Sequence, residues 1–448
     1  MFILSAHTGF RATSKVFLLF LGAFPKALKS IPFVPAWTTI RSWVFRVGLY
    51  KLIRTKEKAD DWIIIYDFIV QAGHQKCLLV LGVRQKTLAD HKAKNGNVDI
   101  SYSDLEPFAI VPMESSSGDQ VKAILDEIKK KTGNISQLLC DGGSDVTKAG
   151  RLYKEENPDV ITSYDVCHKL AIFLGRELKK DQVWNNISKQ ITKTKNKTKQ
   201  SASSCTSPPQ QREKSRLMNS EQVVDWLLEI HNFIYSAEEQ YVKTELDECE
   251  LTGIHKDELE RKLAWVKDYK NEIKEYDELV WVIKIGCHIV RREGFHAKIA
   301  DSVEAKFKTK KIGSRANKLS ETILEFLKEQ SKDLKDDQLL LGSSEIIEST
   351  IGQYKLLVER TTATQSITGQ ILTLGCIVGN NSLSTITEAL ESVTEKDLDE
   401  WMSTNIGTSD LSKRRKIMGA RKITEIKKGC KHKLISLRLE ERFQRSKS

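Results

Sequence analysis

Apolar residues in the first half of the chain alternate between strand-like and helix-like patterns. Short runs rich in β-branched residues predict five strands, at 62–66, 77–83, 108–112, 137–140 and 160–164. Helical periodicity predicts a helix after the third, fourth and fifth of these runs, at 119–131, 146–156 and about 168–179. The order β-β-β-α-β-α-β-α predicts an antiparallel meander followed by parallel strands, and therefore an α/β fold with a mixed sheet.

The pattern changes beyond the last of these helices. Residues 193–216 are rich in Lys, Ser, Gln and Pro, which is typical of a linker or an exposed loop. Residues 219–335 are almost wholly helical in pattern, so we expect an α-helical insertion over 181–339. A further helix is predicted to begin after Ser343 and Ser344, which are good N-cap residues.

A helix-turn-helix region is expected before the first strand. Pro32 and Pro35 interrupt the chain ahead of an amphipathic helix predicted at 38–52. Arg41 and Arg46 lie off the apolar stripe of that helix, and arginine side chains can reach the phosphates and base edges of DNA. We therefore expect these two arginines to bind DNA.

Several features argue against export and against a membrane location. The apolar run Val16–Phe24 is short and has no small-x-small cleavage site, so it predicts a buried helix of a small N-terminal domain. The 8 cysteines show no C-x-x-C pairing, which fits a reducing compartment. No apolar run reaches the roughly 18–20 residues that cross a bilayer. A cytoplasmic protein, associated with the nucleoid when bound to DNA, is expected.

Charge is concentrated at the two ends of the chain. Residues 1–60 hold 10 Lys and Arg against 2 Asp and Glu, and residues 411–448 hold 14 against 3. The segment between them, 61–410, holds 47 basic against 55 acidic residues. Basic arms on a mildly acidic body favour a polyanionic partner, of which nucleic acid is the commonest. A merely solvated basic tail is the alternative.

Two aspartates follow predicted strands directly. Asp67 comes after 62–66 and Asp141 after 137–140, so both carboxylates would lie in one crevice if those strands are neighbours. Two carboxylates that close favour a bound cation, and Mg²⁺ or Mn²⁺ prefers oxygen ligands. A third carboxylate would complete a site for two metal ions about 4 Å apart, which supports in-line attack on a phosphodiester. Taken singly, each aspartate could equally be a turn or helix-capping residue.

Four stretches together resemble the DDE transposases of bacterial insertion sequences. They are WIIIYD (62–67), QLLCDGGSDVTKAG (137–150), SYDVCHKLA (163–171) and LLGSSEIIESTIGQYK (340–355), and QAGHQKCLLVLGV (71–83) accompanies the first. The resemblance covers most of 30–360 and depends on the order and spacing of the motifs. It implies an RNase H-like catalytic domain that is interrupted by a helical insertion.

The resemblance also implies the catalytic residues. Asp67, Asp141 and Glu348 would form the triad and bind Mg²⁺ or Mn²⁺. Lys355 lies seven positions after Glu348, two helical turns on one face, and resembles the E-x₆-K part of a signature whose lysine contacts DNA phosphate. Glu345, one turn away on the same side, remains a rival for the third carboxylate.

A second resemblance concerns a histidine. The sequence DVCH at 165–168 resembles the Cys/His pair that follows the second aspartate in hAT-type transposases, where His168 would help to position the scissile phosphate. A histidine packed at a strand–helix junction is the alternative. Leu341 and Ser344 stand where the E-x₆-K signature has Tyr and Arg, which leaves the subfamily open.

These expectations combine into one domain organisation. We expect a basic helix-turn-helix region at 1–60, an RNase H-like catalytic domain at 61–180 and 340–380, the helical insertion at 181–339, and a C-terminal helical region with a basic tail at 381–448. The expected function is DNA transposition by metal-dependent cleavage and strand transfer. The expected partners are the terminal inverted repeats, target DNA and a second copy of the chain. An RNase H-like structure-specific nuclease and a catalytically decayed DNA-binding protein from a truncated element are the alternatives.

Overall fold

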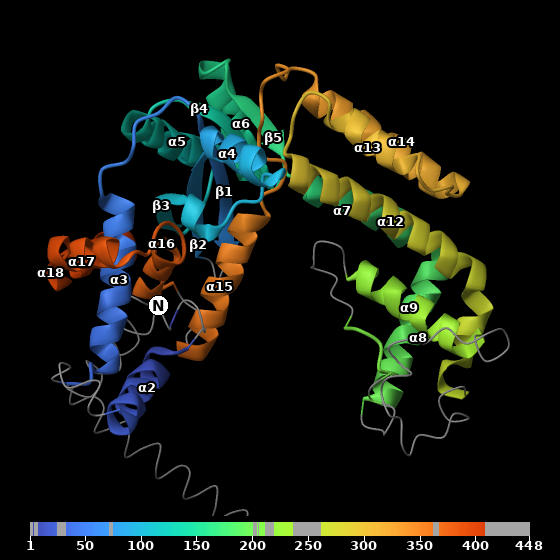
Figure 1. Cartoon of the computed structure of the whole chain (residues 1–448), viewed down its shortest axis with the longest axis horizontal. Coiled ribbons are helices and arrows are strands. Elements are labelled where there is room, and N and C mark those ends of the chain that lie inside the picture. Colours follow the sequence, from blue (N-terminus) through green and yellow to red (C-terminus); the bar gives the residue numbers. More distant parts are fainter. Residues whose placement is uncertain are drawn as a thin grey trace, which may run out of the picture.

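The structure, a computed structural model, divides the chain into two lobes (Figure 1). It describes residues 8–24, 33–70, 75–199, 206–210, 219–235, 261–361 and 367–407, and the single positions 3 and 204. The sheet lobe comprises the described residues up to 165 and those from 341 onward, and the helical lobe comprises those in between. Each lobe has an apolar core of its own.

A single mixed sheet forms the centre of the sheet lobe. Its strands are β1 (Trp62–Val70), β2 (Lys76–Arg84), β3 (Glu106–Met113), β4 (Ile135–Cys140) and β5 (Ile161–Tyr164). Their order in the sheet is β3-β2-β1-β4-β5, with β1, β2 and β3 antiparallel and β4 and β5 parallel to β1. The α/β class, the antiparallel meander and the parallel additions predicted from the sequence are therefore confirmed.

One face of the sheet is covered by helices that are close to it in sequence. These are α5 (Gly118–Thr132), which connects β3 to β4, and α6 (Ser144–Glu156), which connects β4 to β5. Val121 and Leu125 of α5 and Ala149 of α6 pack on Ile64 and Leu138 in one core. We refer to this as the local face of the sheet.

The opposite face is covered by helices from both ends of the described chain. They are α3 (Trp37–Ile53), α15 (Glu345–Thr361) and α16 (Thr373–Ile377), and η4 (Gly369–Leu372) precedes α16. Ile63 and Ile65 of β1 share a core with Leu49, Ile351 and Leu374 from these helices. We refer to this as the non-local face of the sheet.

One helix of the sheet lobe was not predicted. α4 (Gln85–Asn95) follows β2, so the order becomes β-β-α-β-α-β-α-β-α, apart from the short turn η1 (Tyr102–Asp104). Its sequence, QKTLADHKAKN, contains one buried residue, Leu88, and no helical apolar stripe. Apolar periodicity therefore gave no signal for it.

The helical lobe begins immediately after β5. It contains α7 (Val166–Lys180), α8 (Gln182–Thr198), α9 (Ser220–Tyr235), η3 (Ala264–Tyr269), α12 (Lys270–Glu293), α13 (Ile299–Phe307) and α14 (Ser314–Ser331). The chain returns to the sheet lobe at an antiparallel bridge between Phe295 and Leu340. Residues 193–198, predicted as part of a linker, are the end of α8, whose apolar side is buried at Ile187 and Ile191.

The N-terminal helices differ from expectation. α2 (Phe10–Ala23) was predicted to be buried, but Leu18, Leu19 and Phe20 are 62%, 71% and 44% exposed, so that prediction is wrong. α2 contacts α3, and Phe10 and Thr13 are its buried residues.

Helix α3 is closely joined to the C-terminal part of the sheet lobe. A Cβ atom at Gly48 would lie 1.9 Å from the carbonyl oxygen of Leu372, so the absence of a side chain allows the two backbones to touch. α17 (Leu383–Ser392) and α18 (Glu395–Asn405) also pack against α3. The basic tail predicted at 411–448 lies outside the described residues. No helix in the described ranges is long and apolar enough to cross a membrane.

Candidate active site at the strand ends

The two candidate aspartates are neighbours across β1 and β4. The parallel pairing of these strands ends with Ile65 opposite Leu139. Asp67 and Asp141 each follow two residues after this last pair, Asp67 within β1 and Asp141 directly after β4. The expectation that both residues belong to one end of the sheet agrees with this register.

Asp67 does not end its strand, contrary to the sequence prediction. β1 continues to Val70, because Asp67 pairs with Leu79 of β2 and the antiparallel hairpin runs three residues further. On one side of Asp67, β1 is therefore still paired with β2. On the other side, its pairing with β4 has already ended. A carboxylate on paired backbone is more precisely held than one on a loop.

Asp67 points toward the non-local face. Side chains alternate along a strand, and Ile63, Ile65 and Ile69, which have the parity of Asp67, all belong to the core on that face. Asp141 follows the last residue of β4, and its Oδ1 accepts from the Gly143 backbone N–H at 3.0 Å. The helix that covers this face is α15, which packs against β1.

A buried glutamine fixes the chain that enters α15. Gln137 of β4 is fully buried, and its Nε2 donates to the Leu341 carbonyl oxygen at 2.7 Å. Its Oε1 accepts from the Leu341 backbone N–H at 2.9 Å, and Nε2 also donates to the Ser163 Oγ at 3.0 Å. One side chain thus joins β4, β5 and the start of α15, across about 200 residues of sequence.

A buried aspartate completes this attachment. Asp165, also fully buried, is the N-cap of α7, and its Oδ1 accepts from the His168 backbone N–H at 2.8 Å. Its Oδ2 accepts from the Ser344 backbone N–H at 2.7 Å and from the Ser344 Oγ at 2.5 Å. The N-termini of α7 and α15 therefore share one carboxylate, which the positive ends of both helix dipoles stabilise. Sequence reasoning missed the positioning roles of Gln137 and Asp165.

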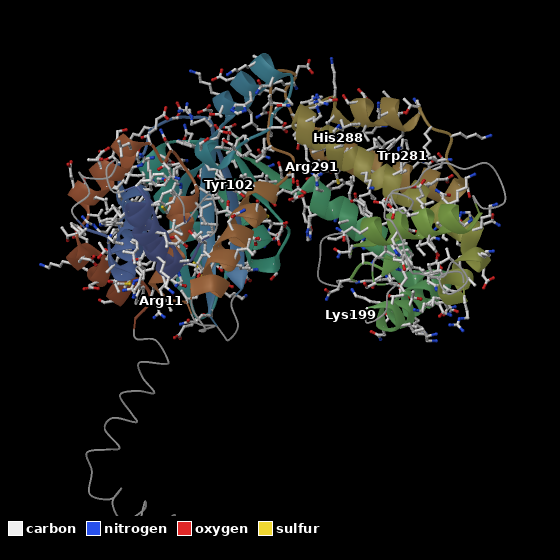
Figure 2. The ribbon with its side chains drawn as sticks, turned by 60° about the horizontal axis from the view of Figure 1, so that its bottom comes forward. Arg11, Tyr102, Lys199, Trp281, His288 and Arg291 are labelled. Atoms are coloured by element: carbon white, nitrogen blue, oxygen red, sulfur yellow. The ribbon has the colours of Figure 1, made fainter. Side chains whose placement is uncertain are left out.

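The two candidate glutamates of α15 have different surroundings. Glu345 forms an ion pair with Arg291 of α12, which lies at the junction of the two lobes (Figure 2). Glu348, one turn later, is half-buried, and Lys355 is exposed. The ion pair directs the Glu345 carboxylate toward the helical lobe.

The three carboxylates do not form a closed ligand set in this structure. Among the described residues, no three His, Cys, Asp or Glu side chains lie close enough to hold a metal ion together. Asp67 and Asp141 lie at one end of the paired strands β1 and β4, and α15 packs against β1. Glu348 does not form a ligand cluster with the two aspartates in this structure.

His168 and Tyr164 lie beside the strand ends. The His168 ring centroid is 6.0 Å from that of Tyr164, and its Nδ1 is buried without a hydrogen-bond partner among the described residues. Burial and the neighbouring Asp141 carboxylate raise the pKa of Tyr164 to about 12. A tyrosine that stays protonated next to Asp141 can act as a hydrogen-bond donor at neutral pH.

The arginines predicted to bind DNA have internal contacts. Arg46 donates through Nε and Nη2 to the carbonyl oxygens of Val393 and Leu390, at the end of α17. The Arg41 guanidinium lies 5.5 Å from the ring centroid of Trp37 and 5.9 Å from that of Phe45, and its side chain is exposed. Arg46 thus caps a helix C-terminus, a favourable place for a cation, whereas Arg41 remains accessible.

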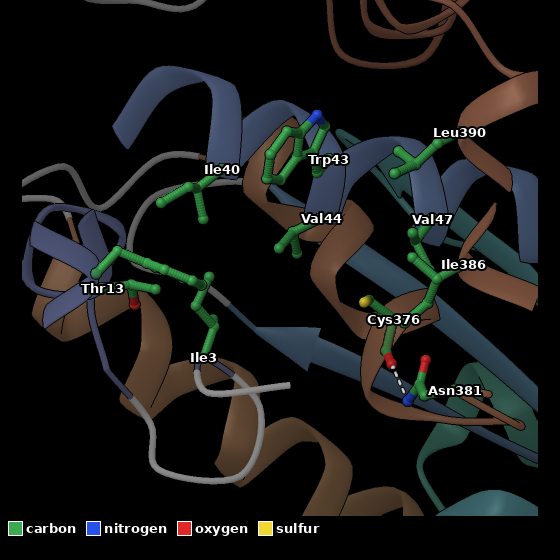
Figure 3. Close-up of a pocket in the computed structure, with 11 residues that line it drawn as sticks. Ile3, Thr13, Ile40, Trp43, Val44, Val47, Cys376, Asn381, Ile386 and Leu390 are labelled. Carbon is green, nitrogen blue, oxygen red and sulfur yellow. Dashed lines mark hydrogen bonds between the residues drawn. The ribbon is translucent and has the colours of Figure 1, made fainter. Parts of the chain in front are cut away.

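A cavity of about 260 Å³ lies between α2, α3 and α17 (Figure 3). Its walls are mostly apolar, among them Ile40, Val44 and Ile386, and the Asn381 side-chain amide donates to the Cys376 carbonyl oxygen at 3.0 Å. The described residues that line it include no cationic or acidic side chain, which makes it unsuited to phosphate chemistry.

Comparison with known proteins gives no further assignment. No protein-family model matches the chain, and no curated protein matches its sequence. The function has to be argued from the residues and their arrangement.

Proposed function

We propose that this chain is a DDE-type DNA transposase, which cuts phosphodiester bonds at the ends of its insertion sequence and joins the 3′-hydroxyls to target DNA. The observation that supports the proposal is the parallel pairing of β1 and β4, which ends two residues before Asp67 and Asp141, together with the packing of α15, the helix that bears Glu348, against β1. An RNase H-like domain, as implied by the resemblance, agrees with the strand order and with a helical lobe inserted between the second and third carboxylates.

The expected cofactor is Mg²⁺ or Mn²⁺, and the donor chemistry fits it. Asp67, Asp141 and Glu348 supply only oxygen ligands, which hard divalent cations prefer. When bound, the metal would activate water or a 3′-hydroxyl and stabilise the leaving oxygen. Glu348 would have to approach the two aspartates to complete the site, because the described residues contain no three-member ligand cluster.

The remaining residues would bind and orient DNA. Lys355 is exposed on the same side of α15 as Glu348, so it can meet a phosphate beside the carboxylates. His168 is a candidate for holding the scissile phosphate, since its Nδ1 has no hydrogen-bond partner among the described residues. Because transposition joins two element ends, the active species is expected to contain at least two copies of the chain.

The test is DNA nicking with and without each aspartate. Asp67→Ala and Asp141→Ala should abolish Mg²⁺-dependent nicking of a supercoiled plasmid that carries the reading frame with its flanking genomic DNA. Gel-shift affinity for the same flanks should stay within about threefold, since binding comes mainly from phosphate contacts of basic residues. The matched control is Asp99→Ala, which removes an exposed loop carboxylate and should nick normally.

The alternatives give different results in the same assay. Normal nicking by either aspartate variant contradicts the proposal. Binding without nicking by the wild-type chain would favour a decayed DNA-binding protein. Cutting that depends on DNA structure and ignores the flanking sequence would favour a nuclease.

A further inference from the structure

A cavity of about 400 Å³ lies at the edge of the sheet formed by β5, outside the carboxylate set. It is lined by Tyr66, Leu138 and Cys140 from the strands, by residues of α6 and β5, and by Gln330 of α14. Its volume falls within the range of about 300–1,000 Å³ that is usual for small-molecule sites.

A glycine and a tyrosine shape the inner end of this cavity. The Tyr66 hydroxyl donates to the Val146 carbonyl oxygen at 2.9 Å beneath α6. A Cβ atom at Gly150 would lie 2.9 Å from the Tyr66 Oη, so any larger residue would crowd the tyrosine and fill the space beside it. At Gly150, the absence of a side chain therefore keeps the space beside Tyr66 open.

Two cations on this wall have no partner within the described residues. Arg151 and Lys154 of α6 line the cavity, and neither side chain forms an ion pair or hydrogen bond there. Lys148 on the same helix, in contrast, is paired with Asp119 at 2.6 Å. One carboxylate, the exposed Glu155, also lines the cavity, so the cations outnumber it. Such an excess of positive charge favours an anionic occupant.

An aromatic ring connects the cavity with the candidate active site. Tyr164 lines the cavity, and a Cβ atom at Gly142 would lie 2.4 Å from the Tyr164 Oη, so the hydroxyl lies over the residue next to Asp141. The Lys169 Nζ lies 5.0 Å from the centroid of the Tyr164 ring. Cations beside an aromatic ring are the features with which proteins hold unpaired nucleotides, through phosphate contacts and base stacking.

We propose that this cavity binds one unpaired nucleotide of the DNA strand that enters the candidate active site. Arg151 and Lys154 hold its phosphates, Tyr164 stacks on the base, and the hydroxyls of Thr147 and Thr162 border the sugar. This inference rests on the proposed function, because it names the part of the DNA substrate that the sheet edge would take. Double-stranded DNA does not fit a cavity of this size.

Binding of a fluorescein-labelled oligonucleotide of ten thymidines tests the inference. Fluorescence anisotropy of the full chain in EDTA, over a range of salt concentrations, separates binding from metal-dependent cleavage. The double variant Arg151→Ala Lys154→Ala should weaken binding about tenfold or more. It should also flatten the slope of log K against log salt by about 1.4, since each lost phosphate contact on single-stranded DNA contributes about 0.7.

The matched control is the double variant Lys86→Ala Lys94→Ala. Both lysines are exposed on α4, which follows the end of β2 where Arg84 pairs with Trp62 at the start of β1. That is the end of β1 opposite to the aspartates, so the affinity and the slope should stay at the wild-type values. Equal losses in the two double variants would contradict a specific site at β5.

Photocrosslinking locates the bound strand. With 5-iodouracil in place of one thymine, ultraviolet irradiation should attach the oligonucleotide to the tryptic peptide 155–169, which contains Tyr164. Adducts confined to 411–448, with an unchanged salt slope in Arg151→Ala Lys154→Ala, would overturn the inference. The plasmid assay remains independent: a crosslink at Tyr164 without any nicking would retain the nucleotide site and remove the transposase function. Normal nicking with neither the crosslink at Tyr164 nor the change in salt slope would retain the transposase function and remove the nucleotide site.

Discussion

The two faces of the sheet are closed by different kinds of chain segment. The local face is covered by α5 and α6, which directly connect the strands that they pack on. The non-local face is covered by α3, α15 and α16, which arrive from both ends of the described chain. The difference shows where a fold needs specific polar contacts. A helix between two strands is positioned by its short links, whereas a helix that returns after about 180 residues needs an anchor at the point of return.

Buried polar side chains supply those anchors on the non-local face. Gln137 and Asp165 hold the start of α15, and Lys51 of α3 donates to the Val378 carbonyl oxygen and to the Asn381 Oδ1, both at 2.7 Å. All three side chains are fully buried. The face that carries the candidate carboxylates is therefore also the face whose alignment depends on hydrogen-bond geometry.

Among the predicted effects on the non-local face, the largest change in stability is expected at Gln137. Gln137→Leu should lower the free energy of unfolding by about 3–5 kcal/mol, because it leaves the N–H and carbonyl of Leu341 buried without partners. Urea unfolding followed by circular dichroism measures the change. Gln120→Leu on the exposed side of α5 is the control for the local face and should shift stability by less than about 0.5 kcal/mol. Similar losses of unfolding free energy in both variants would mean that the buried Gln137 contributes no more to stability than the exposed Gln120.

The second prediction concerns the buried cation of α3. Burial lowers the pKa of Lys51 to about 8 from its ordinary value of 10.5. Between pH 8 and 10.5 the unfolded chain therefore binds more protons at this residue than the folded chain does, so stability contributed by Lys51 rises as pH rises through this window. Below pH 8 both states are protonated and the cost of burying the charge is fully present.

Unfolding free energies at pH 7.5 and pH 10 measure this effect. Lys51→Met should remove roughly 2 kcal/mol of the increase that the wild-type chain shows between these two values. Lys86→Met, an exposed lysine of α4, should leave the pH dependence unchanged. The same increase in wild type and in Lys51→Met would show that the lysine has an ordinary pKa in the folded chain.

The sequence predicted the main helices on both faces of the sheet closely, including α15, which begins directly after Ser343 and Ser344 as expected, and its misses have physical reasons. α5 and α6 begin and end within two residues of the predicted 119–131 and 146–156, since each has a continuous apolar stripe. α4 was missed because Leu88 is its one buried residue. The exposure of α2 was missed because an apolar run does not reveal whether a partner covers it.

The candidate site was predicted in part for the same reasons. Strand order and periodicity were sufficient to bring Asp67 and Asp141 to one end of the sheet. The pairing of Glu345 with Arg291 and the anchoring of α15 depend on contacts between residues far apart in sequence. One local signal existed: Gln137 is a polar residue within an apolar strand at a position that faces the core, and such a residue requires a buried partner.

The central claim is that Glu348 acts with Asp67 and Asp141, and a pair of conservative variants tests it most directly. The initial rate of Mg²⁺-dependent nicking of the flank-bearing plasmid should fall by roughly 100-fold or more in Glu348→Gln, which keeps the shape of the side chain and removes its charge. Glu345→Gln should stay within about threefold of wild type, because its carboxylate is engaged with Arg291. A loss of nicking in Glu345→Gln together with normal nicking in Glu348→Gln would contradict the assignment, and normal nicking in both would contradict the catalytic triad itself.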